Sequence, residues 1–312
     1  MNFKRVIIGP LLSVVFLTGF IYAVSGINVA FGRMSLNFNP QNYLSSISGG
    51  IQNNQQINYP QNLVASQVPQ IDAESAISVE SDLSRTSKIL FEKSSNNKLP
   101  IASLTKLMTA VVVIDRYNLS DTAVVDKIAD SQSPLKQDIK LGDIMTVDNL
   151  LKIMLVKSSN KAAYTLAERS NGETGVKNFV ALMNQKAKEM GLDSTFYVDP
   201  TGLNPDNIST ASDLIKLTEY ILKNYPEIAE ISRQRKINVP GFGTIENSDP
   251  LLGGIPDVVC SKTGFTAEAK GCLLLVIDKP GSDNYLINVV LGADNRFFEM
   301  QKLISWSNAA CK

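Results

Sequence analysis

The sequence of 312 residues contains no histidine. This absence excludes a Ser-His-Asp triad, a Cys-His catalytic pair and a histidine-ligated zinc site. Any hydrolytic chemistry therefore needs another general base. Lysine is the natural alternative, because burial and a neighbouring cation can lower its pKa until part of the population is neutral near neutral pH.

Cysteine is scarce, since the chain has only Cys260, Cys272 and Cys311. An odd count without a CxxC spacing indicates neither a metal site nor a dense disulfide framework. Cys260 and Cys272 flank a predicted hairpin and could pair, but cysteine is often simply a small core residue. We expect buried free thiols in preference to a disulfide, and neither a metal nor a cofactor.

The chain also lacks net charge, because 30 lysine and arginine residues balance 30 aspartate and glutamate residues. No overall field therefore draws the protein to nucleic acid or to an anionic membrane surface. Nucleic acid is not an expected partner. With 44% hydrophobic residues the chain can build one large core, and we expect one domain with appendages.

The amino-terminal part differs in composition from the rest. Residues 6–24 carry no charge and follow a Lys-Arg pair, which is typical of a membrane-targeting segment whose amino terminus stays in the cytoplasm. We expect residues 1–30 to be a cleaved signal or a retained anchor, with the anchor slightly favoured. Residues 31–71 are rich in Asn, Gln, Ser and Gly and predict a flexible linker. The remainder is then expected at the extracytoplasmic face of the cell membrane, or exported if the leader is cleaved.

Residues 72–312 have the pattern of a folded domain, with strands at both ends and helices between them. Such an order favours an α+β domain in which an antiparallel sheet joins the two ends of the chain and a mostly helical subdomain is inserted. The β-branched run at 111–114 prefers a strand by propensity, and we expect a buried helix to override it. Predicted strands cover 76–80, 88–94, 257–266, 271–278 and 285–294, and helical patterns cover 103–114, 147–155, 160–168, 179–190, 211–225 and 296–310.

A nucleophilic serine without histidine needs another base held against it. Ser-x-x-Lys on a helix provides one, because residues three apart share a face. The pattern occurs at Ser95, Ser103, Ser133 and Ser158, so at least three matches are accidental. Only Ser103 opens a long apolar segment, which would place a helix amino terminus in the core and aim its dipole at developing negative charge. We therefore predict Ser103 as nucleophile and Lys106 as base, against the alternative of an ordinary helix start.

Two further patterns support this site. Ser158 and Asn160 fall at a break between helical stretches, where a hydroxyl can relay a proton to a leaving amine and an amide can hold a substrate carbonyl and the lysine base. Such a triplet is also common in turns and caps. Lys262, Thr263 and Gly264 lie on a predicted strand. There a cation and a hydroxyl can bind a substrate carboxylate, and the glycine lets substrate backbone approach closely.

These segments together resemble the low-molecular-mass penicillin-binding D-alanyl-D-alanine carboxypeptidases, within the serine β-lactamase and transpeptidase superfamily. The resemblance spans residues 72–312 and rests on PIASLTKLMTA, LLKIMLVKSSNKAAYTLAE, FYVDPTGLNPDNISTASDL and SKTGFT. It implies a β-lactamase/transpeptidase-like fold and a serine hydrolase that removes the terminal D-alanine of peptidoglycan stem peptides through an acyl-enzyme on Ser103. It implies β-lactams as acylating inhibitors, with Lys262 and Thr263 binding the terminal carboxylate. It also implies an oxyanion hole made by the backbone N–H groups of Ser103 and Phe265.

Two positions depart from the family's pattern and are expected to affect rate or substrate preference. Lys161 stands where the family often has aspartate, and the region around Ile208 lacks the histidine that is frequent before Ser-Thr-Ala. The family's frequent carboxy-terminal β-domain and amphipathic tail have no counterpart in this sequence. We therefore expect the amino-terminal segment to replace that tail as anchor.

Other functions share the same motifs. A class A β-lactamase needs a glutamate-bearing loop that activates water, and no convincing Glu-x-x-Leu-Asn motif is present. A catalytically weak relative that binds peptidoglycan would be expected to have lost one of the motif residues, and all are intact. Carboxypeptidase, endopeptidase and transpeptidase activities stay open alternatives, because all pass through the same acyl-enzyme.

Overall fold

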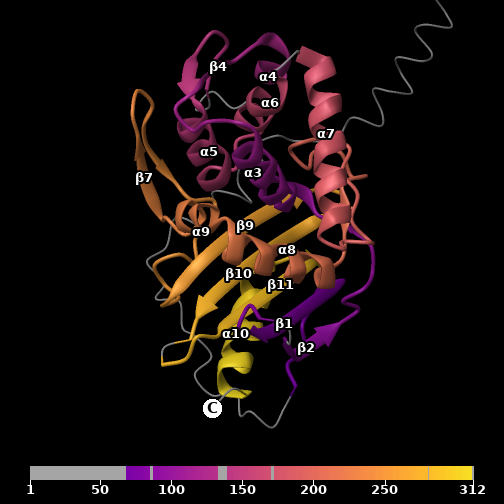
Figure 1. Ribbon diagram of the computed structural model, residues 1–312. Helices are drawn as coiled ribbons and strands as arrows, with labels where there is room; N and C mark the ends of the chain where they lie inside the picture. Colours follow the sequence, from indigo (N-terminus) through magenta and orange to yellow (C-terminus); the bar gives the residue numbers. More distant parts are fainter. Residues whose placement is uncertain (1–67, 85–86, 133–138, 170–171, 280, 311–312) are drawn as a thin grey trace, which may run out of the picture. The chain divides into compact units, whose positions relative to one another are not determined.

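The computed structural model describes residues 68–84, 87–132, 139–169, 172–279 and 281–310 (Figure 1). The predicted signal or anchor at 1–30 lies outside these residues, as does most of the predicted linker at 31–71. Cys311 lies outside them too. Within the described part of the chain, no helix is long and apolar enough to cross a membrane.

A five-stranded antiparallel sheet in the order β2-β1-β11-β10-β9 joins segments from the two ends of the described chain (Figure 1). The first two strands along the chain pair with the last three, because β1 lies beside β11. The predicted sheet is therefore confirmed. Its strands are β1 (Ser75–Ser81), β2 (Lys88–Lys93), β9 (Val258–Thr266), β10 (Lys270–Asp278) and β11 (Tyr285–Ala293).

The chain between β2 and β9 forms the predicted helical part, and α10 (Arg296–Ala310) follows the last strand. Every predicted helical segment is helical, whereas the short strand pairs, α4 and α9 were not predicted, because such short segments carry little periodicity. The elements are β3 (Leu99–Pro100), the 3-10 turn η1 (Ala102–Leu104), α3 (Thr105–Arg116), β4 (Thr122–Val124), α4 (Lys127–Ser131), β5 (Ile144–Thr146), α5 (Val147–Val156), α6 (Asn160–Glu168), α7 (Gly172–Glu189), β6 (Ile208–Ser209), α8 (Ala211–Asn224), α9 (Pro226–Ser232), β7 (Lys236–Val239) and β8 (Gly243–Glu246).

Different helices cover the two faces of the sheet. Along β10, Leu274 and Val276 pack into the core shared with the inserted helices, whereas Leu273 and Leu275 pack into the core shared with α10. Successive side chains of a strand point to opposite faces, so a strand buried on both faces is apolar at every position. This explains the unbroken apolar run in β10, and it makes the sheet the middle layer between α10 and the other helices.

The helix α3 lies at the centre of the inserted helices (Figure 1). All residues from 105 to 113 are buried, including the β-branched Val111, Val112 and Val113. Burial on all sides therefore overrides the strand propensity of this run, as expected. A helix this deeply buried supports the residues at its amino terminus rigidly.

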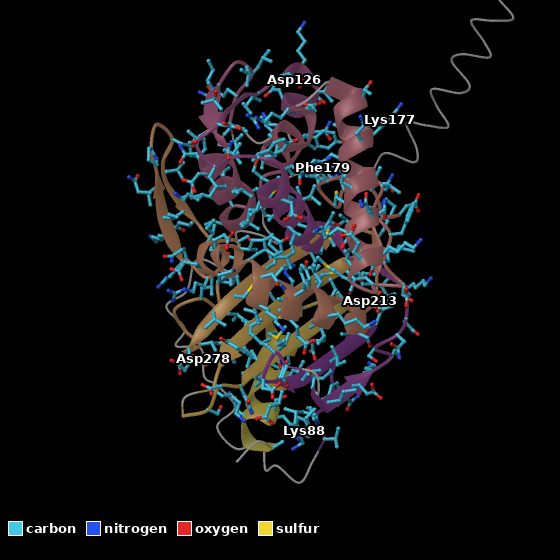
Figure 2. The ribbon with its side chains drawn as sticks, in the orientation of Figure 1. Lys88, Asp126, Lys177, Phe179, Asp213 and Asp278 are labelled. Carbon is cyan, nitrogen blue, oxygen red and sulfur yellow. The ribbon has the colours of Figure 1, made fainter. Side chains whose placement is uncertain are left out.

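The helix α7 shows the amphipathic pattern that places the other inserted helices. Phe179, Met183 and Ala187 recur every fourth residue and are buried, while Lys177 is exposed (Figure 2). The helix was predicted over 179–190. It begins earlier, at Gly172. This start was not predicted, because the first turns carry few apolar residues and give no periodic signal.

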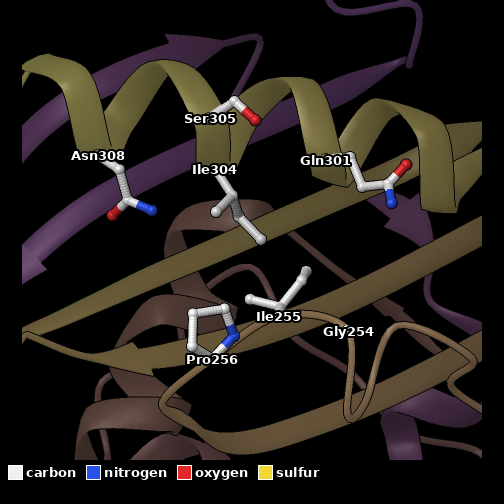
Figure 3. Close-up of a pocket in the computed structure, with 7 residues that line it drawn as sticks. All are labelled: Gly254, Ile255, Pro256, Gln301, Ile304, Ser305 and Asn308. Atoms are coloured by element: carbon white, nitrogen blue, oxygen red, sulfur yellow. The ribbon is translucent and has the colours of Figure 1, made fainter. Parts of the chain in front are cut away.

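A small pocket lies beside α10 (Figure 3). Ile255 and Ile304, which line it, belong to the core on the α10 face of the sheet. Ala102 and Leu104, which flank Ser103, belong to the core on the other face. The pocket is therefore separate from the predicted nucleophile.

Candidate active site

Ser103 lies in the 3-10 turn η1, directly before α3. The sequence predicted that Ser103 opens the helix itself, but the helix begins at Thr105, because the Leu104 N–H bonds the Ile101 carbonyl and tightens this turn. Lys106 follows in the first turn of α3 and is fully buried. Its Nζ lies 2.8 Å from Ser103 Oγ. The predicted nucleophile and base are therefore in hydrogen-bond contact.

Asn160 holds Lys106 from a second side. It is the first residue of α6, and its Oδ1 accepts a hydrogen bond from Lys106 Nζ at 2.7 Å. Ser159 caps this helix, because its Oγ accepts from the Ala162 N–H at 3.1 Å. Ser158 has a left-handed backbone with φ of 62°. Residues other than glycine rarely adopt this conformation, and where they do they are often at functional sites. The predicted break between helices thus brings the second motif to the lysine.

A backbone carbonyl forms a third contact of Lys106. Lys106 Nζ donates to the Thr201 carbonyl at 2.7 Å. Thr201 lies in the Asp-Pro-Thr-Gly-Leu stretch, for which no role was predicted. Every residue has a carbonyl, so residue type carries no signal that could have identified this one.

The third motif lies on a strand, β9, as predicted, and this strand forms an edge of the sheet. Lys262 Nζ donates to Ser158 Oγ at 2.9 Å, so the second and third motifs are in direct contact. A Cβ added to Gly264 would lie 3.0 Å from the backbone nitrogen of Ser103, so the glycine permits β9 to pass close to the nucleophile turn. The structure therefore brings the three motifs together. The residues concerned are Ser103, Lys106, Ser158, Asn160, Lys262, Thr263 and Gly264, followed on β9 by the part-exposed Phe265.

Lys262 is a buried cation with an altered pKa. Burial lowers the pKa of its ammonium group to about 7, and the nearby guanidinium of Arg296 acts in the same direction. The buried carboxylate of Asp249 opposes both effects. Asp249 is itself held by Ser261, whose Oγ donates to its Oδ2 at 2.5 Å. Lys262 therefore changes its charge near neutral pH, and an anion bound beside it would favour the charged form.

Two residues beside β9 were not predicted from the sequence as part of the site. Arg296 begins α10, and its guanidinium lies 5.7 Å from the centre of the Phe265 ring. Ser248 precedes β9, and its Oγ lies 2.6 Å from Thr263 Oγ1. Neither forms a motif with Lys262 along the chain. Only the fold places a second cation and a second hydroxyl at this strand.

The two described cysteines are buried free thiols, as expected. Cys260 lies opposite Val276 and Cys272 lies opposite Gly264, so they do not face each other across the β9–β10 pair. Burial raises the pKa of each thiol to about 11. Neither thiol is therefore activated as a nucleophile.

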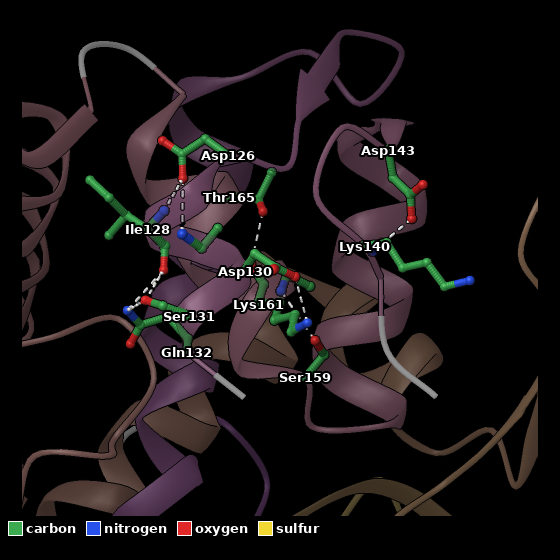
Figure 4. A network of polar contacts seen from close by, with 12 residues as sticks. Asp126, Ile128, Asp130, Ser131, Gln132, Lys140, Asp143, Ser159, Lys161 and Thr165 are labelled. Carbon is green, nitrogen blue, oxygen red and sulfur yellow. Dashed lines mark hydrogen bonds and ion pairs between the residues drawn. The ribbon is translucent and has the colours of Figure 1, made fainter. Parts of the chain in front are cut away.

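Lys161, at the position where the family often has aspartate, forms an ion pair with Asp130 of α4 (Figure 4). The Nζ–Oδ1 distance is 2.7 Å, and Lys161 is only 7% exposed. Asp126 caps α4 by accepting from the N–H groups of Ile128 and Ala129. The ion pair therefore ties α4 to the first turn of α6, which also carries the second motif.

We expect Lys161→Asp to lower the free energy of unfolding, because it places a second carboxylate beside Asp130. Asp130→Lys alone should also lower the free energy of unfolding. The double variant Asp130→Lys with Lys161→Asp should be more stable than the sum of the two single changes predicts, by a coupling energy of about 0.5–3 kcal/mol. Urea unfolding of the four proteins measures this cycle. Strictly additive effects would show that the pair contributes nothing to stability.

Known proteins resemble this chain in sequence and in fold. The family described as D-alanyl-D-alanine carboxypeptidase matches residues 62–295. The carboxypeptidase DacF of Bacillus subtilis (strain 168) is 32% identical over 232 residues, which are 71% of this chain and 58% of DacF. A D-alanyl-D-alanine endopeptidase of Escherichia coli (strain K12) is 33% identical over 252 residues, which are 76% of this chain and 78% of that protein.

Solved structures agree with this relationship. Penicillin-binding protein D2 from Listeria monocytogenes in its ampicillin-bound form is 26% identical, with a TM-score of 0.68 over 79% of this chain and 100% of that chain. Penicillin-binding protein 6B from Escherichia coli is 30% identical, with a TM-score of 0.66 over 78% of this chain and 80% of that chain. The expected transpeptidase-like fold is therefore confirmed. The chain belongs to the D-alanyl-D-alanine carboxypeptidase family of serine peptidases.

Proposed function

We propose that this protein hydrolyses the terminal D-alanyl-D-alanine bond of peptidoglycan stem peptides through an acyl-enzyme on Ser103. The contact of Lys106 Nζ with Ser103 Oγ at 2.8 Å, in a chain without histidine, carries this proposal. The family supports the substrate class. The ampicillin-bound structure of a relative supports β-lactams as acylating inhibitors.

Acylation begins with proton transfer from Ser103 to Lys106. The neutral amine of Lys106 takes the hydroxyl proton as Ser103 Oγ attacks the carbonyl carbon of the penultimate D-alanine. The new C–O bond leaves negative charge on the carbonyl oxygen, which the N–H groups of Ser103 and Phe265 stabilise. The close approach of Gly264 to the Ser103 nitrogen supports this pair of donors, because it brings the backbone of β9 to the nucleophile turn.

The leaving D-alanine needs a proton as the C–N bond breaks. The Ser158 hydroxyl is suited to relay it, because it can give its own proton to the departing nitrogen and take back the proton that Lys106 removed from Ser103. Its oxygen accepts a hydrogen bond from Lys262 Nζ, which makes the hydroxyl more acidic. Lys106, neutral again, then takes a proton from water as the water oxygen attacks the ester carbon. It returns this proton to the Ser103 oxygen as the ester bond breaks and the shortened stem peptide departs. Asn160 holds Lys106 through both steps.

The substrate's terminal carboxylate is proposed to bind Lys262, Thr263 and Arg296. Because burial lowers the pKa of Lys262 to about 7, its ammonium fraction falls as pH rises through that value. The carboxylate binds the charged form, so we expect KM for a free-acid peptide to rise by up to about tenfold per pH unit above this pKa. Steady-state assays across the range measure the effect, and Lys262→Arg should flatten it, because a guanidinium stays charged.

The control is the same peptide with an amidated carboxy terminus, which offers no carboxylate. Lys262→Ala should raise KM by about 10–100-fold for the free acid, in line with a charged hydrogen bond of about 1.5–3 kcal/mol, and much less for the amide. Lys270 lies on the same hairpin but is exposed, so Lys270→Ala should leave KM unchanged for both the free-acid and the amidated peptide. Equal losses on both peptides would contradict the carboxylate role.

A second activity is favoured by the relatives named as endopeptidases, one of which is 33% identical. Cleavage of a crosslink passes through the same acyl-enzyme, with the amine of a second stem peptide as leaving group. Purified crosslinked muropeptide dimers separate the two activities. Conversion of dimers to monomers would support the endopeptidase, and D-alanine release from monomers alone would support the carboxypeptidase.

We also propose that the protein works at the extracytoplasmic face of the cell membrane. The apolar composition of residues 6–24 and the cell-wall substrate class support this location. Membrane fractions of cells that make the full-length chain provide the test. Retention after an alkaline carbonate wash would support the anchor, and recovery of a shortened protein outside the membrane would support a cleaved signal.

A further inference from the structure

We infer that Asp199 is a positioning residue for the lysine base. Its carboxylate holds the Thr201 carbonyl against Lys106 Nζ and thereby orients the lone pair of that amine toward Ser103. This inference rests on the proposed roles of Ser103 and Lys106, and it adds to them a residue that does not itself touch the reacting atoms.

The Asp199 side chain is buried and organises a single turn. Its exposed fraction is 7%. A buried carboxylate is costly unless donors satisfy it, and the donors here all belong to residues 201–207. Oδ1 accepts from the Thr201 N–H and hydroxyl at 2.6 Å each and from the Gly202 N–H at 2.8 Å. Oδ2 accepts from the Asn204 N–H and from Asn207 Nδ2, both at 2.8 Å. The carboxylate therefore fixes the shape of the turn.

This turn contacts the nucleophile segment on both sides of Ser103. Its carbonyl groups accept hydrogen bonds from that segment, and its glycine lies against the backbone just before Ser103. The contacts are Lys106 Nζ to the Thr201 carbonyl at 2.7 Å, Thr109 Oγ1 to the Pro200 carbonyl at 2.7 Å, the Ile101 N–H to the Asn207 carbonyl at 3.1 Å, and Gly202 against the Ala102 carbonyl. A change in the turn would therefore be transmitted to the lysine.

The oxygens around Lys106 determine where its lone pair points. Nζ lies 2.8 Å from Ser103 Oγ, 2.7 Å from Asn160 Oδ1 and 2.7 Å from the Thr201 carbonyl. The amide and backbone oxygens can only accept, whereas a hydroxyl can also donate. A neutral amine has two N–H groups and one lone pair. When both N–H groups bond the two acceptors, the lone pair is left to receive the Ser103 proton.

The test is Asp199→Asn in the full-length chain. The amide is nearly isosteric, but its NH₂ must face donors of the turn, so the Thr201 carbonyl loses its fixed place. We expect the first-order rate constant of acylation by a chromogenic cephalosporin to fall by about 10–100-fold, as a displacement of about 1 Å in a catalytic site does. The dissociation constant of the non-covalent complex and the number of acylated sites per molecule should stay unchanged.

This division of effects separates positioning from mere stability. A structural role would reduce the number of sites that react and leave the rate constant of the remaining sites unchanged. Asp206→Asn is the matched control, because Asp206 is an exposed carboxylate in the same turn, and it should acylate at the normal rate. If Asp199→Asn does not fold, Thr201→Val, which removes one donor to Asp199, should show a smaller fall in the same rate constant.

An exchange provides the rescue. Asp199→Asn with Asn207→Asp returns a carboxylate to the turn and should recover part of the rate, whereas Asn207→Asp alone sets two carboxylates together and should be slow. A normal rate constant in Asp199→Asn, or a loss confined to the number of reactive sites, would overturn the inference. Failure of the unmodified protein to acylate at Ser103 would instead overturn the proposed function.

Discussion

Ser103→Ala is expected to leave a folded protein that forms no adduct with penicillin and releases no D-alanine from a D-alanyl-D-alanine peptide. The alanine has no atom that can form the ester, and removal of a nucleophile lowers the turnover rate by at least ~10⁴-fold. The change should not disturb the fold, because the hydroxyl is a small, half-buried group at the end of the buried Lys106 side chain. Intact mass and circular dichroism measure both points.

Ser95→Ala is the matched control, because Ser95 begins another Ser-x-x-Lys match. Its hydroxyl donates a hydrogen bond to Glu92 Oε2 at 3.2 Å. This variant should keep the adduct and the peptidase activity. An adduct that survives Ser103→Ala would show that another residue is the nucleophile.

Gly202→Ala is expected to disrupt the site strongly, because Gly202 lies against the backbone of the nucleophile turn. Gly202 has φ of 82°, and a Cβ there would lie 1.8 Å from the Ala102 carbonyl oxygen. The obstructing atom belongs to the backbone of the nucleophile turn and cannot rotate away. We expect a loss of more than about 3 kcal/mol of unfolding free energy, typical of severe steric conflict, and at least a ~100-fold fall in the acylation rate.

Gly191→Ala separates the two causes of this loss. Gly191 has a similar φ of 67°, but a Cβ there would meet no described atom within 4 Å. The free energy of unfolding of Gly191→Ala should therefore fall by only about 1–2 kcal/mol, the cost of a left-handed backbone for alanine, and its acylation rate should stay normal. Urea unfolding and stopped-flow acylation measure both variants. Equal losses of stability, with normal acylation by Gly202→Ala, would contradict the close contact between turn and nucleophile.

The motif residues could be predicted because their side chains carry the chemistry. Ser103 and Lys106 are three residues apart, so one helical turn brings their side chains into contact. The second and third motifs, which follow in the chain, supported the choice of this Ser-x-x-Lys match over the others. The contact between Lys262 and Ser158 joins residues separated by 104 positions, and it was not predicted. The roles assigned to the two motifs placed both at one substrate, but only the structure shows that their side chains touch.

The supporting residues could not be predicted in the same way. The Thr201 carbonyl acts through an atom that every residue has, and Asp199 acts through hydrogen bonds to backbone N–H groups. Arg296 reaches β9 only because the sheet brings the start of α10 to that strand. Such roles depend on tertiary structure, and no spacing along the chain encodes them.

The fold was predictable where hydrophobic periodicity is long and strong. The strands β10 and β11 are rich in apolar residues, with an unbroken apolar run in β10, and both were predicted almost to the residue. The start of α3 was placed slightly too early, because the 3-10 turn that holds Ser103 has the same local composition as a helix. The short pairs β4–β5 and β7–β8 are held by tertiary contacts and gave no clear period.

The acyl-enzyme on Ser103 is tested most directly by treating the full-length protein with penicillin and then with a D-alanyl-D-alanine peptide. Intact mass and peptide mapping follow the first reaction, and release of D-alanine follows the second. We expect a stable adduct of one penicillin on Ser103 together with release of D-alanine from the peptide. Rapid penicillin turnover without peptide cleavage, or the absence of any adduct, would contradict it.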